Sequence, residues 1–298
     1  MNEILALTKR NIKLFFKDKG MFFTAMITPA ILLVLYATFL SNVYEDSFTM
    51  HLPEGFVLSE SLINGLVGGQ LVSSLLAVSC VTVAFCSNFL MVQDKANGSI
   101  HDLKITPVKA SALSISYYCA TLFSTLAICF VATAICLVYL AIVGWYLSVG
   151  EVFLLFLDVT LLSLFGTAIS SVINFFLSTQ GQISAVGSIV SSCYGFICGA
   201  YMPISTFGDG LQKVISFLPG TYGTALVRNH ALGGVFTEMA SQGVPTAVVE
   251  SMKSAVDCNL SFFGNQVPIG VMYAVLGGAV ALLVGAYILM NALKKKDK

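Results

Sequence analysis

The sequence predicts an all-α integral membrane protein with six transmembrane helices, and two observations lead to this fold class. Hydrophobic residues make up 57% of the 298 residues and charged residues only 10%, whereas soluble domains carry about 25% charged residues. Mean hydropathy is correspondingly high, at +0.88. In addition, six apolar runs have about the 20 residues that a helix needs to cross the ~30 Å hydrocarbon core. The expected spans are residues 21–40, 65–92, 111–146, 152–177, 183–201 and 267–289.

Two of these runs, 65–92 and 111–146, exceed the minimum length. Parts of the two helices should therefore tilt or project beyond the hydrocarbon core. We expect the run 111–146 to form one helix, because each half alone would be too short to span.

The distribution of lysine and arginine predicts the orientation, because these residues concentrate in cytoplasmic loops. Residues 41–64 contain neither, and carry Glu45, Asp46, Glu54 and Glu60. Both termini and residues 93–109 are therefore expected in the cytoplasm of a multi-pass cell-membrane protein. The segments 147–151 and 202–266 are expected outside, and the turn 178–182 inside. The basic segments contain Lys9, Arg10, Lys13, Lys17 and Lys19, then Lys95, Lys104 and Lys109, and finally Lys294, Lys295, Lys296 and Lys298.

Targeting and cysteine usage add two expectations. Residues 21–40 are long enough to span and lack a clean cleavage site, so no cleaved signal peptide is expected. Cys258 alone lies in a predicted outer loop, so no disulfide framework is expected. The other cysteines lie in the spans: Cys80, Cys86, Cys119, Cys129, Cys136, Cys193 and Cys198.

The first twenty residues have the pattern of an amphipathic helix. Lys9, Arg10, Lys13 and Lys17 share one arc at 100° per residue, and apolar residues cover most of the remainder. This favours an interfacial helix whose cations face anionic lipid headgroups, with Gly20 allowing the turn into the first span. The alternative is a basic flank without fixed structure.

Residues 93–108 form a short polar island between two long apolar runs. Asn97 and Gly98 should break the preceding helix, and Ser99 should cap a new one with Asp102 as its capping partner. The pattern therefore predicts a separate, capped helix at the membrane surface.

The island should be a helix of about two turns with a small apolar face. Ile100 and Leu103 provide that face, and Thr106-Pro107 should end the helix. A face of this kind could contact a partner. The alternative is an ordinary capped loop between two spans.

The fifth predicted span carries a stripe of small residues on one helical face. Such residues allow helix backbones to approach closely in a membrane. The stripe could serve packing within one bundle or a contact with a second protomer. Its members are Ser184, Ser188, Ser191, Gly195 and Gly199.

The outer segment 202–266 is too apolar in its first half for a solvent loop. Two short runs separated by Pro219-Gly220, the second ending at Arg228, predict a re-entrant hairpin. Arg228 could bind an anionic headgroup or pair with an outer acid such as Asp209. An amphipathic outer helix is expected near 245–256, with Val248, Val249, Met252 and Val256 on one face.

The sequence has few signs of catalytic or cofactor chemistry. It contains no phosphate-binding loop and no Gly-x-Ser-x-Gly elbow, and His51, His101 and His230 lack metal-ligand spacing. We therefore expect no catalytic residue, metal, cofactor or nucleic-acid partner. Asp158 alone lies clearly inside a span, where it could mark a polar pathway or reach water near the outer end.

Three motifs occur in order along the chain. The island reads Asp94-x-x-x-Gly98-Ser-x-x-Asp-Leu103-x-x-Thr-Pro107, the fifth span ends Gly199-Ala-Tyr-Met-Pro203, and Pro219-Gly-Thr-Tyr222 leads to Leu-Val-Arg228. With six spans, this arrangement resembles the membrane permease of type-2 ABC exporters over essentially the whole chain. Residues 1–298 would then form one permease domain. The chain departs from the family at Gln93-Asp-Lys-Ala-Asn97, where a Glu/Arg-rich run is often found.

The resemblance implies that the island is a coupling helix seated in a groove of a separate ATPase subunit, which would bind ATP and Mg. Two ATPase copies would act on two permeases, as a homodimer or with a paralogue, in contact with membrane lipids. The implied ATPase contacts are Asp94, Lys95, Gly98, Ser99, Ile100, Asp102, Leu103, Lys104, Thr106 and Pro107. The implied outer gate comprises Pro203, Pro219, Tyr222 and Arg228.

The sequence leaves the cargo and two alternative functions open. A pathway lined by Ser, Thr, Gly and Phe suits an amphipathic, lipid-like, drug or peptide/glycan substrate. A secondary transporter or channel that works without ATP is one alternative. A membrane anchor or immunity protein that transports nothing is the other.

Overall fold

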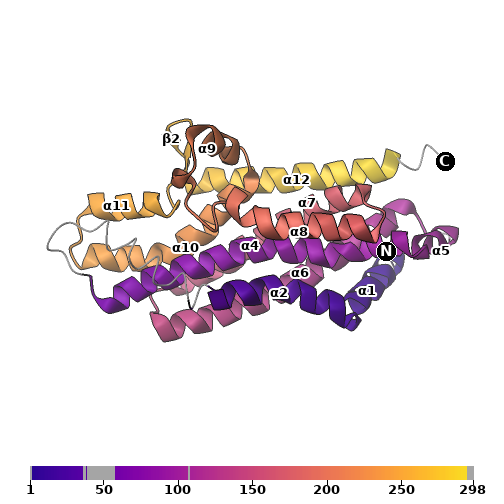
Figure 1. The fold of residues 1–298 in the computed structure, drawn as a ribbon, viewed down its shortest axis with the longest axis horizontal. Helices are drawn as coiled ribbons and strands as arrows, with labels where there is room; N and C mark the ends of the chain where they lie inside the picture. Colours follow the sequence, from indigo (N-terminus) through magenta and orange to yellow (C-terminus); the bar gives the residue numbers. More distant parts are fainter. Residues whose placement is uncertain (1, 36–37, 39–57, 107, 294–298) are drawn as a thin grey trace.

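The computed structural model describes residues 2–35, 38, 58–106 and 108–293. Several predicted features lie outside these residues: the end of the first span, the acidic side chains of 41–57, Pro107 and the tail lysines. The described chain forms an elongated helical bundle with one two-stranded hairpin (Figure 1). The elements are α1 Asn2–Lys17, α2 Lys19–Leu35, α4 Glu60–Ala96, α5 Ser99–Ile105, α6 Ala110–Val143, α7 Val149–Phe176, α8 Gln180–Ile197, η2 Ile204–Thr206, α9 Asp209–Ser216, α10 Pro219–Ser241, α11 Thr246–Ala255, β1 Ser261–Phe262, β2 Asn265–Gln266 and α12 Ile269–Leu293.

Helix α4 is the centre of the bundle. It is buried along most of its length and packs against α2, α6, α7, α8 and α10. Its sequence is apolar on every side, as expected for a helix surrounded by other helices rather than one with a single buried stripe. Figure 1 shows α4 running through the middle, with α12 along one edge and α2 along the other.

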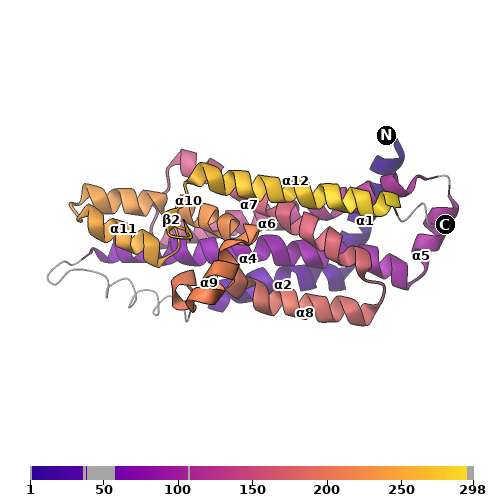
Figure 2. The same ribbon diagram turned by 90° about the horizontal axis from the view of Figure 1, so that it is seen from above.

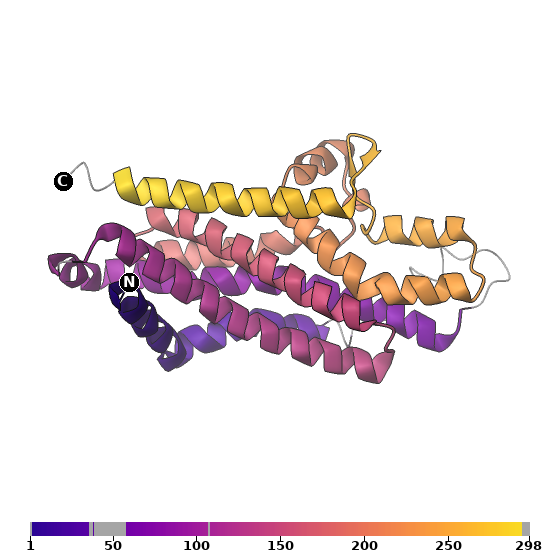
Figure 3. The same ribbon diagram turned by 180° about the vertical axis from the view of Figure 1, so that it is seen from behind.

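The two ends of the bundle differ in their elements. Helix α5, the start of α1 and the C-terminal end of α12 lie at one end, as Figures 1 and 3 both show. Helix α11 lies at the opposite end, and Figure 2 places α8 along one side of the bundle. The charged island and the N-terminal basic helix therefore belong to the same end of the molecule.

Among the described residues, long helices occupy four of the six predicted spans, whereas α8, at the predicted fifth span, is not among the helices that are long and apolar enough to cross a membrane. In the part of the chain that the structure describes, α4, α6, α7 and α12 are long and apolar enough to cross a membrane. A fifth span results if α1 and α2, which meet at a bend of 73°, count as one broken span. Helices α4 and α6 have 37 and 34 residues, so the predictions of excess length and of one unbroken third span are confirmed.

The turn between α1 and α2 was expected at Gly20, but the bend does not fall there. The break lies at Asp18, and Gly20 is already inside α2. The Asp18 carboxylate accepts a hydrogen bond from the Met21 amide at 3.1 Å, so this side chain caps the second helix. A capping carboxylate therefore sets the position of the turn.

The outer segment contains a helix on each side of Pro219, as expected, but only the first, α9 Asp209–Ser216, is short. Pro219 does begin α10, in the first turn where no amide hydrogen bond is lost. The helix then continues through Arg228 and His230 to Ser241, so the prediction of a short arm ending at Arg228 is wrong. Those polar residues do not end the helix because their side chains have partners within the bundle.

The remaining outer elements follow the prediction more closely. Helix α11 spans Thr246–Ala255 and buries Val249 and Met252, which confirms the expected amphipathic helix near 245–256. A tight hairpin, β1 and β2, then leads into α12.

Candidate functional site

The polar island contains a separate short helix, as predicted, but with different capping. Helix α4 ends at Ala96, and Gly98 adopts a left-handed φ of 79° between the two helices. Gly98, rather than Ser99, is the N-cap of α5, because only the glycine tolerates this backbone conformation without strain. At the other end the Thr106 hydroxyl donates to the Leu103 carbonyl at 2.5 Å, in agreement with the predicted stop.

The apolar side chains of α5 divide between the bundle and the surface. Ile100 and Leu103 are half-buried and pack against the hydrophobic core of the same chain. Ile105 is instead 84% exposed. Ile105 was not among the predicted contact residues, although its position just before the Thr106-Pro107 stop was an available signal. Ile105 is therefore the apolar side chain of α5 that is exposed at the surface.

Asp94, expected to face a partner, lies inside the chain. Its carboxylate accepts hydrogen bonds from Arg10 Nη1 at 2.8 Å and from the Tyr117 hydroxyl at 2.5 Å. The Asp94 side chain is buried, whereas that of Arg10 is 33% exposed. This carboxylate joins α1 and α6 to the last turns of α4.

Lys95 joins the same end of α4 to a third helix. Its ammonium donates to the carbonyls of Asn174, Phe175 and Leu177, each at 2.9 Å. These carbonyls close the C-terminus of α7, where a cation is favoured by unpaired acceptors and by the helix dipole. The helix end that carries α5 is thus held by α1, α6 and α7.

The other predicted contact residues of the island are distributed around α5. Asp102 and Thr106 are exposed, and Ser99 is half-buried. The side chain of Lys104 and the whole of Pro107 lie outside the described residues.

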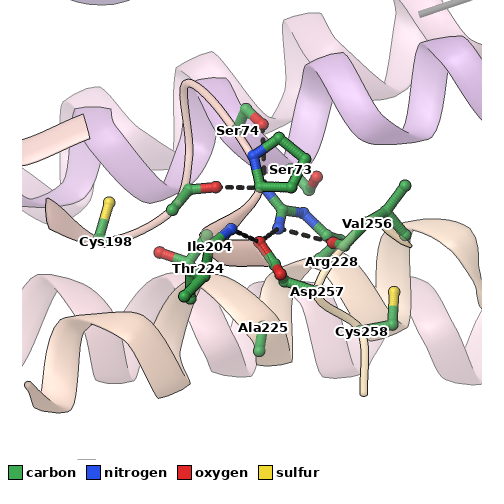
Figure 4. Close-up of polar contacts among 12 residues, drawn as sticks. Ser73, Ser74, Cys198, Ile204, Thr224, Ala225, Arg228, Val256, Asp257 and Cys258 are labelled. Atoms are coloured by element: carbon green, nitrogen blue, oxygen red, sulfur yellow. Dashed lines mark hydrogen bonds and ion pairs between the residues drawn. The ribbon is translucent and has the colours of Figure 1, made fainter. Parts of the chain in front are cut away.

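A buried arginine in α10 joins several segments beside the first half of α4 (Figure 4). The Arg228 side chain is 1% exposed and lies 3.4 Å from the Asp257 carboxylate. Its guanidinium also donates to Val256 O at 2.7 Å, to Gly199 O at 3.0 Å and to Ser74 Oγ at 3.4 Å. The expected pairing with an outer acid is therefore confirmed, but the acid is Asp257 rather than Asp209, and the buried guanidinium does not face a lipid headgroup.

Asp257 extends this cluster to the turn after α8. Its Oδ2 accepts a hydrogen bond from the Ile204 amide at 2.9 Å, while Asp257 itself adopts a φ of 55°. Burial raises the pKa of the Asp257 carboxyl above its ordinary value, and the Arg228 charge opposes that rise. The Arg228–Asp257 cluster thus ties α4, α10 and the turn after α8 to the segment following α11.

The remaining predicted gate residues lie at the neighbouring turns. Pro203 precedes the 3-10 turn η2, and Pro219 occupies the first turn of α10. The Tyr222 hydroxyl donates to Ser216 O at 2.6 Å across the junction of α9 and α10. Pro203 therefore lies beside the Arg228–Asp257 cluster through Ile204, whereas Tyr222 holds the α9–α10 turn.

Asp158 has two partners that the sequence analysis missed. Its carboxylate lies 2.5 Å from His230 Nδ1 and accepts a hydrogen bond from the Tyr273 hydroxyl at 2.5 Å. The three residues come from α7, α10 and α12, and Asp158 is 1% exposed. The interpretation that this carboxylate reaches interfacial water is therefore contradicted.

The small-residue stripe of α8 is divided between two environments. Ser184 and Ser188 are exposed and Ser191 is half-buried. Gly195 makes room for the Tyr201 ring, and Gly199 turns the chain with a φ of 73°. The C-terminal part of the stripe thus serves packing within the chain, and the N-terminal part remains open.

Comparison with known proteins adds the family. The sequence model of the family described as ABC-2 type transporter matches residues 2–231. This chain belongs to that family. As an ABC-2 chain it is a multi-pass membrane permease, a transport component rather than a catalytic one, and the family in general works with an ATPase partner. No curated protein matches the sequence.

The family match ends within α10. Residues 232–298, which contain α11, the hairpin and α12, lie beyond it. The match nevertheless includes α5, the Arg10–Asp94 contact and Arg228, whereas Asp257, the partner of Arg228, lies beyond it.

Proposed function

We propose that this chain is the permease subunit of an ATP-driven exporter and that α5 is its coupling helix. The observation that supports the proposal is the way α5 is attached to the bundle. Helix α5 follows directly after the end of α4, which Asp94 and Lys95 hold to three other helices. The Ile105 side chain of α5 is exposed at the surface. A short helix held so firmly can transmit a push from a partner into the bundle.

In this proposal the residues of the island have two tasks. Asp94 and Lys95 hold the end of α4 to neighbouring helices inside the permease, and their contacts within the bundle support this role. The exposed side chains Asp102, Ile105 and Thr106 face a groove on the ATPase. ATP and Mg bind to that ATPase, and this chain holds no cofactor and contacts no nucleic acid.

The proposed topology has six spans: α2, α4, α6, α7, α8 and α12. Both termini and α5 lie in the cytoplasm, which the basic segments support. Helix α1 lies in the headgroup plane, with its lysines toward anionic lipid. Two permeases pair through the open face of α8 near Ser184 and Ser188, and each engages one ATPase.

The Arg228–Asp257 cluster is the proposed outer gate. It connects α4, α10, the turn after α8 and the segment following α11, and it must rearrange if those segments separate during export. The proposed cargo is an amphipathic molecule: a lipid-like compound, a drug, a peptide or a glycan.

Substitution of Ile105 tests the coupling proposal most directly. Ile105→Asp should abolish stimulation of the partner ATPase and transport, while leaving the melting temperature unchanged, because the side chain is 84% exposed. Ile105→Val is the matched control and should retain both activities. Full activity of Ile105→Asp would contradict the coupling role of α5.

One observation favours a second candidate, a secondary transporter driven by protons. Asp158 and His230 place two titratable groups in contact inside the bundle, and such groups often mark proton pathways. Transport into proteoliposomes driven by a pH gradient without ATP, and lost in Asp158→Asn, would support this candidate. ATP-dependent transport that Asp158→Asn preserves would exclude it. A protein that transports nothing would show neither activity.

A further inference from the structure

An apolar groove of about 320 Å³ runs along the surface of the bundle beneath the bend of α1 and α2. Its walls are α2 and α6, its floor includes Leu75 of α4, and Phe16 of α1 lies at one end. Every residue that lines it is apolar. The wall residues on α2 and α6 are Phe22, Met26, Pro29, Ala30, Leu33, Ala127, Ile128, Val131, Ala132, Ile135 and Cys136.

Helix geometry and small side chains together create this groove. Helix α2 directs Met21, Ala25, Pro29 and Leu32 into the bundle, so neighbouring side chains of α2 border the gap toward α6. Ala132 occupies the facing position on α6, where a larger side chain would fill the space. The 73° bend between α1 and α2 places Phe16 of α1 at one end of the groove.

The surroundings of the groove determine what can occupy it. Helix α6 is long and apolar enough to span a membrane, and α1 and α2 together pass the same test. The wall residues Val131 and Ile135 are 55% and 48% exposed, so the groove opens to the outer surface of the bundle. An occupant from that side comes from the bilayer, and apolar walls suit a hydrocarbon chain.

Exposed cations stand at the Phe16 end of the groove. Lys13 lies three residues before Phe16, and Lys19 lies three residues before Phe22, so each lysine neighbours a lining ring on its helix. Lys17 is exposed between them. Among the described residues none of these lysines forms an ion pair, and the nearby Asp18 caps α2.

We propose that the groove binds an anionic phospholipid. One acyl chain lies between α2 and α6, and the phosphate contacts Lys13, Lys17 and Lys19. The arrangement of a hydrocarbon-lined groove that ends at three free cations matches an anionic amphiphile. The site requires only that the chain lies in a membrane, and it does not depend on coupling to an ATPase.

Native mass spectrometry of the purified full-length chain tests the site, with dioleoylphosphatidylglycerol and dioleoylphosphatidylcholine as probes in parallel. The wild type should retain phosphatidylglycerol at least about tenfold more tightly than phosphatidylcholine, a difference of ~1.4 kcal/mol. Ala132→Trp should fill the groove and lower retention of both lipids by about tenfold. Ala134→Trp, an exposed position two residues away on α6, is the matched control and should bind as the wild type does.

The lysines are tested with the groove intact. Replacing Lys13, Lys17 and Lys19 with Gln should remove the preference for phosphatidylglycerol and leave retention of phosphatidylcholine unchanged. Lys109→Gln, an exposed lysine at the start of α6, controls for the loss of positive charge. This comparison still decides the matter if Ala132→Trp does not fold.

Two results would overturn the proposal. Equal lipid retention by Ala132→Trp and Ala134→Trp would show that lipid binds elsewhere. A lower dimer fraction for Ala132→Trp with unchanged lipid retention would show that a second copy of the chain covers the groove. Neither result bears on ATPase stimulation through Ile105, so failure here is distinguishable from failure of the proposed transport function.

Discussion

Replacing Arg228 with methionine should destabilise the bundle, because it leaves the Asp257 carboxylate buried without its cation. The Arg228 side chain is 1% exposed and also provides donors to Val256 O and Gly199 O. Removing one partner of a buried ion pair costs about 3–5 kcal/mol. At roughly 2 °C per kcal/mol for a chain of this size, the melting temperature should fall by about 6–10 °C.

A double-mutant cycle separates the charge pair from the loss of hydrogen bonds. Asp257→Asn removes the negative charge, and asparagine tolerates the φ of 55° at this position. The double variant Arg228→Met/Asp257→Asn should therefore be more stable than the sum of the single effects predicts, by about 1–3 kcal/mol. Arg228→Lys keeps the charge but not the planar fork, and should lie between the wild type and Arg228→Met.

The assay is thermal unfolding of the purified full-length chain in one detergent, followed by intrinsic fluorescence. Two results would refute the reasoning. One is an Arg228→Met variant that melts with the wild type. The other is a cycle in which the two substitutions add without coupling, because the residues would then act independently.

Two further predictions concern the same clusters. Burial raises the pKa of Asp257 in the folded chain, whereas the pKa of an aspartate in an unfolded chain is about 3.9. The folded state therefore binds the proton more tightly, so this residue's contribution to stability should decline as the pH rises from about 4 through the raised pKa. Melting temperatures measured against pH should show that decline in the wild type and not in Asp257→Asn, and matching profiles would contradict it. At the α5 end of the bundle, Asp94→Asn should weaken the contacts to Arg10 and Tyr117. Because Arg10 is one-third exposed, we expect a loss of only about 1 kcal/mol and about fivefold faster amide exchange in α1. Exchange in α12 is the internal reference, and unchanged exchange in α1 would show that Asp94 does not hold this helix.

Local features of the chain were predicted well from the sequence. The long apolar runs became α4, α6, α7 and α12, because a run of twenty apolar residues has few alternatives to a buried or membrane-embedded helix. The break at Gly98 was predicted because glycine alone readily adopts a positive φ. The amphipathic α11 followed from the spacing of Val249 and Met252.

Features that depend on distant side chains were predicted poorly. The end of α10 was wrongly predicted at Arg228. The sequence around an arginine does not show whether its side chain is buried among acceptors or lies at the end of a helix. Asp94 and Lys95 were expected at a partner surface for a similar reason. Exposed and buried charges cannot be distinguished until their neighbours are known.

The sequence by itself determined the membrane class, the helical architecture and the position of the short helix α5, because hydropathy and helix breaking depend on neighbours along the chain. Only the tertiary structure decided which charged residues are paired inside the bundle. Arg10 meets Asp94 across 84 positions, Asp158 meets His230 across 72, and Arg228 meets Asp257 across 29. Each pair joins separate elements, so its formation depends on how the helices pack, and that packing leaves Ile105 as the exposed apolar residue of α5.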